Sequence, residues 1–455
     1  MTTDPDNRNF YLVQPLPRLF ARTATPILVV LSLNGVLTLA DAYFVGRYVG
    51  STALTAVTLM FPIFMMLVAL STLVGNGMAS ILARRLGASQ LAEATRVFAG
   101  AHGLALAVSI LLALGFAICG RWLALRAANG DPATAAMGYS YIAILIFASP
   151  VGFVLGIQSD ALRSEGRIRL ITSVGLAVTL LNIQFNYLLI AIAGLGVAGA
   201  AIGTVLAQIL GLAFVVGYRL RGGAVIGQPL PAIADWRAIL ALGAPQSLTY
   251  LGVALGSAAI IAAMQIWAGP EYPHTVAAYG VISRILIFLY MPVLSIALAM
   301  QAIAGNNIGA RLTDRSLASL RMAALTAGGY CLFAQAGLYL MRERIGYGFV
   351  DEPQTVGEVS RLLPMILAMY WAAGPLAMLS SYFQAAGDSL RAATLSLPRT
   401  YLFAIPLTFL LPNLLGESGI WLAGPTAETM MLLLAVATLL YLNRGRGYRW
   451  GIVRP

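Results

Sequence analysis

An aspartate lies inside one of the most apolar stretches near the start of the sequence. Asp41 belongs to LSLNGVLTLADAYFVGRYVG, and the nearest basic residue in that stretch is Arg47, further along it. A carboxylate inside a membrane-spanning helix costs about 2.5 to 3.5 kcal/mol on insertion scales, which favours a functional role. Such a group can exchange a proton or bind Na⁺ as its surroundings alternate between wet and dry. The alternative is a helix-end carboxylate hydrated at the membrane interface.

Further polar residues could complete such a site. Asn182 and Asn186 are four apart in LLNIQFNYLL, so a helix places them on one face. Thr204 lies in the next apolar stretch, and Tyr141 in GYSYIAILIFASP could donate a phenolic hydrogen bond to the same cavity. We predict that these four residues and Asp41 form a proton or cation coupling site. Two simpler interpretations stay open, because amides can join helices and a tyrosine can anchor a membrane interface.

A second acid lies in an apolar run near the C-terminus. Glu428, in PTAETMM, could pair with Arg399 or Arg284, which also lie within apolar runs. A structural or gating ion pair is therefore predicted. His102 and His274 have no carboxylate or cysteine at metal-ligand spacing, so neither a metal site nor a cofactor is predicted.

The composition indicates the solvent in which these residues work. Hydrophobic residues make up 59% of the 455 residues and charged residues 10%, with a mean hydropathy of +0.83, which excludes a soluble protein. The net charge of +11 comes from arginines scattered singly or in pairs, so nucleic acid is not a predicted partner. The sequence has no phosphate loop and no nucleophile motif, which predicts a protein that is not an enzyme and draws energy from an ion gradient.

Apolar windows between Gly, Pro and charge breaks predict an all-α membrane protein with twelve transmembrane helices. These helices are expected at 19–46, 53–80, 97–119, 136–160, 168–192, 197–220, 238–267, 275–304, 320–340, 358–385, 391–412 and 419–442. The expected domains are an N-terminal segment 1–18, an N-lobe 19–220, a linker 221–237, a C-lobe 238–442 and a tail 443–455.

The two halves resemble each other, as in many transporters. Three passages recur about 221 residues later: GA at 87–88 and 309–310, LRSEG ending at 166 and QAAG ending at 387, and GAAIGTVLAQ at 199–208 and GIWLAGPTAE at 419–428. We therefore predict two pseudo-symmetric six-helix bundles.

Arginine placement predicts the orientation. Most arginines fall in the N-terminal segment, the linker, the tail and alternate loops, which indicates that this side is cytoplasmic. Both termini are therefore expected in the cytoplasm of a bacterial cell, with the chain crossing the inner membrane many times. Halves of equal orientation are related by an axis along the membrane normal, with a central cleft between them.

These passages resemble the multidrug and toxic compound extrusion (MATE) transporters from end to end. The similar passages are ADAYFVGRYVGSTALTAV, ILARRLGA, ALRSEG and LLNIQFNYLL in the first half, and YGVISRI, NNIGARL, FQAAGDSLRAATLSLPR and GIWLAGPTAE in the second. The DinF-like and MepA-like bacterial branch is the most similar.

The resemblance implies a cation or proton site in the N-lobe, to which the family's motif assigns Asp41, Tyr141, Asn182 and Thr204. The sequence departs from the family at Asn186, where DinF-like members often carry a second aspartate. It also lacks the helix-seven glutamate of NorM-like members. Both departures favour proton antiport through Asp41 over Na⁺ coupling.

The expected function is export of amphipathic, cationic small molecules, drugs, dyes or a self-made metabolite, in exchange for H⁺ or Na⁺ by alternating access. The expected partners are the small-molecule substrate and membrane lipid, and the protein is expected to be a monomer. Two alternatives stay open: a lipid-linked oligosaccharide flippase of the same superfamily, and an intramembrane transferase. A flippase would more often line its cleft with basic residues, and a transferase would need clustered acids and histidines.

Overall fold

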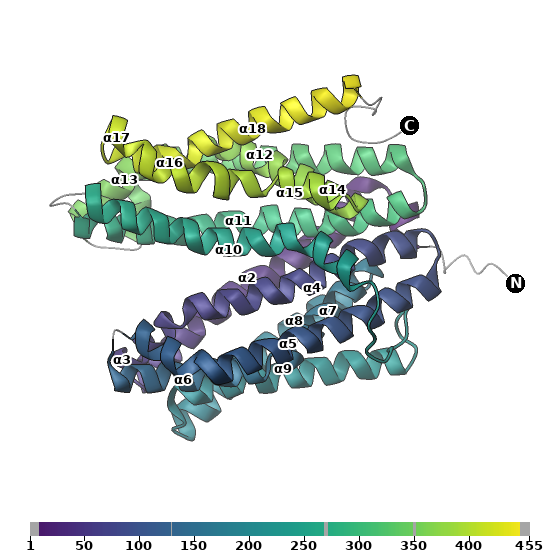
Figure 1. Ribbon diagram of the computed structural model, residues 1–455, viewed down its shortest axis with the longest axis horizontal. Helices are drawn as coiled ribbons and strands as arrows, with labels where there is room; N and C mark the ends of the chain where they lie inside the picture. The colour runs from purple at the N-terminus through teal and green to yellow at the C-terminus, as the bar shows by residue number, and fades with distance from the viewer. Residues whose placement is uncertain (1–8, 129, 268–271, 349–351, 446–455) are drawn as a thin grey trace, which may run out of the picture. The chain divides into compact units, whose positions relative to one another are not determined.

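The computed structural model describes residues 9–128, 130–267, 272–348 and 352–445, in which all regular structure is helical (Figure 1). The first half contains α1 (Phe10–Val13), α2 (Leu16–Tyr48), α3 (Ser51–Leu59), α4 (Phe61–Gly87), α5 (Leu91–Ala127), α6 (Pro132–Phe147), α7 (Ser149–Ser164), α8 (Ile168–Asn186), the π-helix η2 (Tyr187–Ile192) and α9 (Gly196–Leu220). The second half contains α10 (Trp236–Trp267), α11 (Tyr272–Gly309), α12 (Thr313–Ile345), the 3₁₀-helix η4 (Gly346–Gly348), α13 (Pro353–Leu367), α14 (Tyr370–Ala386), α15 (Ser389–Thr394), the π-helix η5 (Arg399–Ala404), α16 (Ile405–Leu410), α17 (Pro412–Leu415) and α18 (Ser418–Gly445).

The helices agree with the predicted number of membrane spans. Among the described residues, ten helical segments are long and apolar enough to cross a membrane. Two further pairs, α6 with α7 and α13 with α14, are long and apolar enough when both helices are taken together, but they bend by 50° and 46° where the two helices meet. Counting each bent pair as one span gives twelve, so the predicted all-α polytopic fold is confirmed.

Two predicted helices are interrupted at prolines. The span expected at 53–80 ends as α3 at Leu59 and restarts as α4, with Pro62 in the first turn. The span expected at 136–160 likewise breaks, and Pro150 lies in the first turn of α7. Proline has no backbone N–H and is well placed in a first turn, whereas in a helix interior it removes a hydrogen bond. The prediction of unbroken helices at these two places was therefore wrong.

The chain divides by packing into two compact units. Unit 1 comprises Met1–Ser247 and Gly305–Arg311, and unit 2 comprises Leu248–Ala304 and Leu312–Pro455. The helix α10 thus begins in unit 1 and ends in unit 2, and the last turn of α11 belongs to unit 1. The lobes and the linker that the sequence suggests, 19–220, 221–237 and 238–442, stay a prediction of how the membrane domains are organised.

Within unit 1, α4 and the end of α11 approach closely at two glycines. A Cβ on Gly87 would lie 1.9 Å from the carbonyl oxygen of Asn306, and a Cβ on Gly309 would lie 1.9 Å from that of Arg84. Only glycine permits this approach, as at small-residue crossings in membrane proteins. Gly87 and Gly309 are also equivalent positions of the sequence repeat, so the crossing joins corresponding turns of the two halves.

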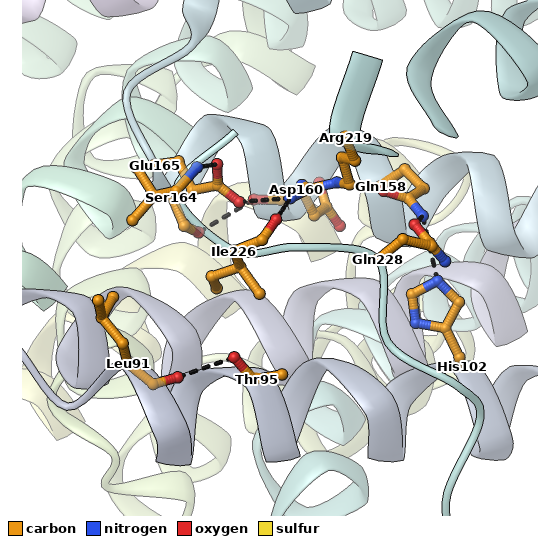
Figure 2. A network of polar contacts seen from close by, with 11 residues as sticks. Leu91, Thr95, His102, Gln158, Asp160, Ser164, Glu165, Arg219, Ile226 and Gln228 are labelled. Carbon is orange, nitrogen blue, oxygen red and sulfur yellow. Dashed lines mark hydrogen bonds and ion pairs between the residues drawn. The ribbon is translucent and has the colours of Figure 1, made fainter. Parts of the chain in front are cut away.

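The linker, here residues 221–235, is bound to the helices of unit 1 through a polar network (Figure 2). Arg219, at the end of α9, forms an ion pair of 2.7 Å with Glu165, at the end of α7. Neither side chain is exposed. Arg219 also donates to the carbonyl oxygen of Ile226, and the Val225 N–H donates to Glu165, at 2.7 and 2.9 Å. The linker backbone therefore helps to satisfy a buried ion pair.

Side chains of two helices extend this network. Gln158 of α7 accepts a hydrogen bond from Arg219 and donates to Gln228 of the linker at 2.7 Å. Its amide nitrogen also lies 3.2 Å from Nε2 of the buried His102 of α5 (Figure 2). The contacts thus connect α5, α7, α9 and the linker.

The end of the linker is fastened to α5 by backbone contacts. The Ala232 N–H donates to the Ala99 carbonyl at 3.0 Å, and the Trp236 indole donates to the Gly100 carbonyl at 2.9 Å. A Cβ on Gly100 would lie 2.1 Å from the Ala234 carbonyl oxygen. Residues 225–236 therefore pack as part of unit 1.

In unit 2, the last helix contacts five other elements. α18 packs against α13, α14, η5, α16 and α17. Its Trp421 is 2% exposed and belongs to an apolar cluster with residues of α11 and α13. This packing positions the middle of α18, which carries Glu428, beside η5.

Candidate functional site

Four of the five predicted coupling residues of the first half come from three neighbouring helices. α2 carries Asp41, α8 carries Asn182 and Asn186, and α9 carries Thr204. α8 packs against both α2 and α9. The four-residue spacing of the asparagines places both amides on one face of α8, where they are 1% and 0% exposed.

A chain of hydrogen bonds joins these four side chains. The Asn182 amide donates to the Thr204 hydroxyl at 2.8 Å, and the Asn186 amide donates to the Asn182 amide oxygen at 3.0 Å. The Asn186 amide also donates to the Asp41 carboxylate. The structure therefore brings together Asp41, Asn182, Asn186 and Thr204, as the spacing of their residues in the sequence suggests.

The amide of Asn186 has a special place in this chain. Its Oδ1 is buried and has no hydrogen-bond partner among the described residues. Gly203 of α9 leaves room for this oxygen, because a Cβ there would lie 2.8 Å from it. The π-helix η2 begins at the next residue, and single-turn π segments are frequent at functional sites. Asn186 can thus present either an N–H or a carbonyl oxygen to Asp41.

Tyr141 lies on α6, near these four side chains, but it is not part of their hydrogen-bonded series among the described residues. It packs against an apolar cluster formed by residues of α2, α3, η2 and α9, and its phenol is within electrostatic range of Asp41. In the part of the chain that the structure describes, no hydrogen bond connects Tyr141 to Asp41. Its predicted place in the coupling site therefore stays a prediction.

The acid of the second half is paired with an arginine. Glu428 of α18 is 5% exposed, and its Oε1 lies 2.7 Å from Nε of Arg399, the first residue of η5. Arg399 is thus the partner, whereas Arg284 of α11 is exposed and has no ion pair among the described residues.

The two histidines lie apart from these sites. His102 belongs to the linker network, and His274 contacts Thr355 and Glu352. Within the described ranges, no group of three or more metal-ligating side chains occurs.

Sequence reasoning missed the buried ion pair of Arg219 and Glu165. Arg219 lies at the end of an apolar run, next to Arg221, where the sequence suggests a hydrated arginine at a helix end. Burial raises the pKa of the Glu165 carboxyl above its ordinary value, and the charge and hydrogen bond of Arg219 oppose that rise. A single sequence carries no signal that distinguishes this arginine from a hydrated one.

A family model and several known proteins match the chain. The family model, described as MatE, matches residues 26–188 and 247–410, which is more than half of the chain. The two matched stretches are related by the same register as the sequence repeat, so the family model and the internal similarity agree on two equivalent halves.

Three curated relatives match over nearly their whole length. The "Probable multidrug resistance protein YoeA" of Bacillus subtilis is 25% identical over 428 residues and 90% of each chain. The "Multidrug export protein MepA" of Staphylococcus saprophyticus is 24% identical over 433 residues and 93% of each chain. A "FAD transporter" of Shewanella oneidensis is 23% identical over 444 residues, with 93% of this chain and 94% of the relative covered.

Solved structures share the fold. A MOP superfamily transporter from Pyrococcus furiosus has a TM-score of 0.85 at 22% identity, covering 93% of this chain and 95% of its own. The outward-facing conformation of a multidrug resistance MATE family transporter has a TM-score of 0.84 at 22% identity, covering 94% and 95%. With a family model that matches most of the chain and a shared fold, this protein belongs to the MatE family and is a multi-pass membrane transporter, not an enzyme.

Proposed function

We propose that this transporter exports amphipathic, cationic small molecules in exchange for protons, with Asp41 as the coupling carboxylate. The observation that carries the proposal is the hydrogen-bonded chain from Thr204 to Asp41. A polar chain that ends on one acid within the membrane is costly, and such residues in transporters mark ion pathways. The names of the YoeA and MepA relatives support multidrug export as the activity.

The neighbours of Asp41 favour a proton over Na⁺. Among the four hydrogen-bonded side chains, Asp41 is the one acid, whereas a Na⁺ site gains affinity from several charged oxygens. Asn186 suits both states of the acid. Its N–H donates to the ionised carboxylate, and after rotation of the amide its free Oδ1 could accept a hydrogen bond from the protonated carboxyl.

The coupling then follows from neutralisation of charge. Ionised Asp41 keeps a negative charge among apolar helices, and a proton removes it, so the two states differ in how well they tolerate exclusion of water. The outward release of substrate is linked to proton uptake, and the return is linked to proton release on the other side. The protein needs no cofactor other than the coupling ion.

The proposed setting is the inner membrane of a bacterial cell. Both termini lie in the cytoplasm, the protein works as a monomer, and substrate enters from the cytoplasmic side. The arginine-rich N-terminal segment, linker and tail support this orientation.

The test is dye efflux from proteoliposomes that hold the purified protein, with proton and Na⁺ gradients imposed separately. Wild type is compared with Asp41→Asn, which keeps the shape and removes the charge. Asp131→Asn is the matched control, because Asp131 caps α6 outside the membrane-spanning helices and asparagine caps helices equally well.

A proton gradient should drive efflux by wild type and by Asp131→Asn, and the rate for Asp41→Asn should fall by at least tenfold. Equal rates for Asp41→Asn and wild type would reject Asp41 as the coupling group. Efflux that responds to a Na⁺ gradient alone would reject the proton as the coupling ion.

A further inference from the structure

The ion pair of the second half consists of one fixed and one movable partner. Glu428 is held in the packed middle of α18 with its side chain 6% exposed. The Arg399 side chain is 49% exposed although its Nε lies 2.7 Å from the carboxylate. The arginine can therefore swing away from the carboxylate, whereas the carboxylate cannot follow.

Both residues lie near the middle of their membrane spans. Arg399 is ten residues into the span Ser389–Leu415, and Glu428 is ten residues into the span Ser418–Tyr441. At 1.5 Å per residue along the continuous helix α18, Glu428 lies about 15 Å from the start of its span, about half of a hydrocarbon core of roughly 30 Å, and Arg399 shares this depth through the ion pair.

This depth decides what surrounds the exposed side of Arg399. A guanidinium that faces lipid at mid-depth is strongly unfavourable, and intramembrane arginines almost always face the bundle interior or a water-filled cavity. Its exposed surface is therefore assigned to a water-accessible space.

The carboxylate has an unused acceptor. Glu428 Oε2 is buried and makes no hydrogen bond among the described residues. The pair of Arg361 and Glu358, also in unit 2, provides a contrast, because Arg361 engages both oxygens of Glu358 at 3.0 and 2.7 Å. Both oxygens of Glu358 thus have a donor, whereas Oε2 of Glu428 has none among the described residues. What the site lacks is a hydrogen-bond donor, which suits a cationic ligand and not an anionic one.

We propose that Glu428 is a substrate-binding carboxylate, which Arg399 neutralises at rest and which the ammonium group of a cationic substrate takes over by displacing Arg399. This inference rests on the proposed function, to which it adds the recognition of substrate charge by the second half. Arg399 acts as an internal stand-in for the substrate cation. The displaced guanidinium moves into the water-accessible space, so no buried charge is left without a partner.

The test compares two ligands that share a fluorophore, one with a charged and one with a neutral end group. Dansylcadaverine carries a primary ammonium group, and N-acetylation removes that charge while the fluorophore stays. Their affinities for the full-length protein in lipid nanodiscs are measured by fluorescence, with empty nanodiscs subtracted. The variants are Glu428→Gln, Arg399→Gln and the double variant, and Glu358→Gln is the matched control.

Wild type and Glu358→Gln should bind the ammonium form about tenfold more tightly than the acetylated form, since one charge-assisted hydrogen bond is gained. Glu428→Gln should lose this preference, and Arg399→Gln should strengthen it because the competing guanidinium is gone. The double variant removes both charges together, so it checks the loss of preference even if a single variant folds poorly.

Persistence of the charge preference in Glu428→Gln and in the double variant would overturn the inference, as would a wild type that binds both ligands equally. The measurement uses no ion gradient. A failure of Asp41→Asn to affect transport, together with a charge preference that depends on Glu428, would reject the proposed coupling and leave this inference standing.

Discussion

Asp41 and Glu428 are both carboxylates within membrane-spanning helices, but their partners give them different chemistry. The partner of Asp41 is the neutral amide of Asn186, so the ionised acid keeps its charge. The partner of Glu428 is the guanidinium of Arg399, so that pair is neutral as a whole. A charged site needs a proton or a cation to become neutral, whereas a neutral pair needs only an exchange of cations.

Asn186→Asp should add a Na⁺ response to transport. The new carboxylate would lie within hydrogen-bonding reach of Asp41, and two adjacent carboxylates cannot both ionise unless a cation lies between them. Dye efflux driven by a Na⁺ gradient should rise severalfold over wild type in proteoliposomes. Asn413→Asp serves as control, because Asn413 is exposed on α17 and its amide donates to carbonyl oxygens of α16. No Na⁺ response in Asn186→Asp would contradict the assignment.

The hydrogen-bonded residues around Asp41 could be predicted from the sequence because helical spacing constrains them. The interval between Asn182 and Asn186 requires one shared face in any helix, and a shared face of amides requires partners such as Thr204. For Glu428 the sequence left two possible partners, Arg399 and Arg284, because contacts between distant helices depend on tertiary packing. The burial of Arg219 in an ion pair could not be predicted for the same reason.

Among the elements, the crossing of α4 with the end of α11 is highly sensitive to added volume. Gly309→Ala should lower the free energy of unfolding by about 1 to 3 kcal/mol, because its Cβ would meet the backbone oxygen of Arg84 at 1.9 Å and the helices must separate. Gly217→Ala is the control. Gly217 lies in α9 with no atom near its Cβ, so alanine there should stabilise by about 0.5 to 1 kcal/mol.

Thermal unfolding of the two alanine variants in detergent checks this prediction through the sign of each shift. A melting temperature of Gly309→Ala at or above that of wild type would show that the helices do not approach as closely as Gly87 and Gly309 indicate.

The number of spans could be predicted from apolar length alone. The 50° and 46° bends could not, because a window of apolar residues does not show where a helix breaks, whether at the first-turn proline of α7 or, without one, before α14.

At the scale of the whole molecule, the linker is an integral part of unit 1. Arg219→Met should destabilise the protein by about 3 to 5 kcal/mol, because it leaves Glu165 buried without a counter-charge. The double variant with Glu165→Leu should regain at least half of that loss. Thermal unfolding measures both, and hydrogen exchange at Val225 should speed up in the single variant. If single and double variants lose equal stability, the ion pair is not what holds the linker.

The fastening of residues 225–236 to α5, α7 and α9 also limits how this gene can be divided. A fragment that stops at residue 220 would lose the backbone partners of Arg219 and Glu165, and unit 1 itself continues to Ser247, inside the unbroken helix α10. No loop cut leaves both units whole. The internal repeat can still be recognised in the sequence, but its two copies do not form separate folding units. Co-expressed half-genes should therefore assemble poorly at every loop junction between them.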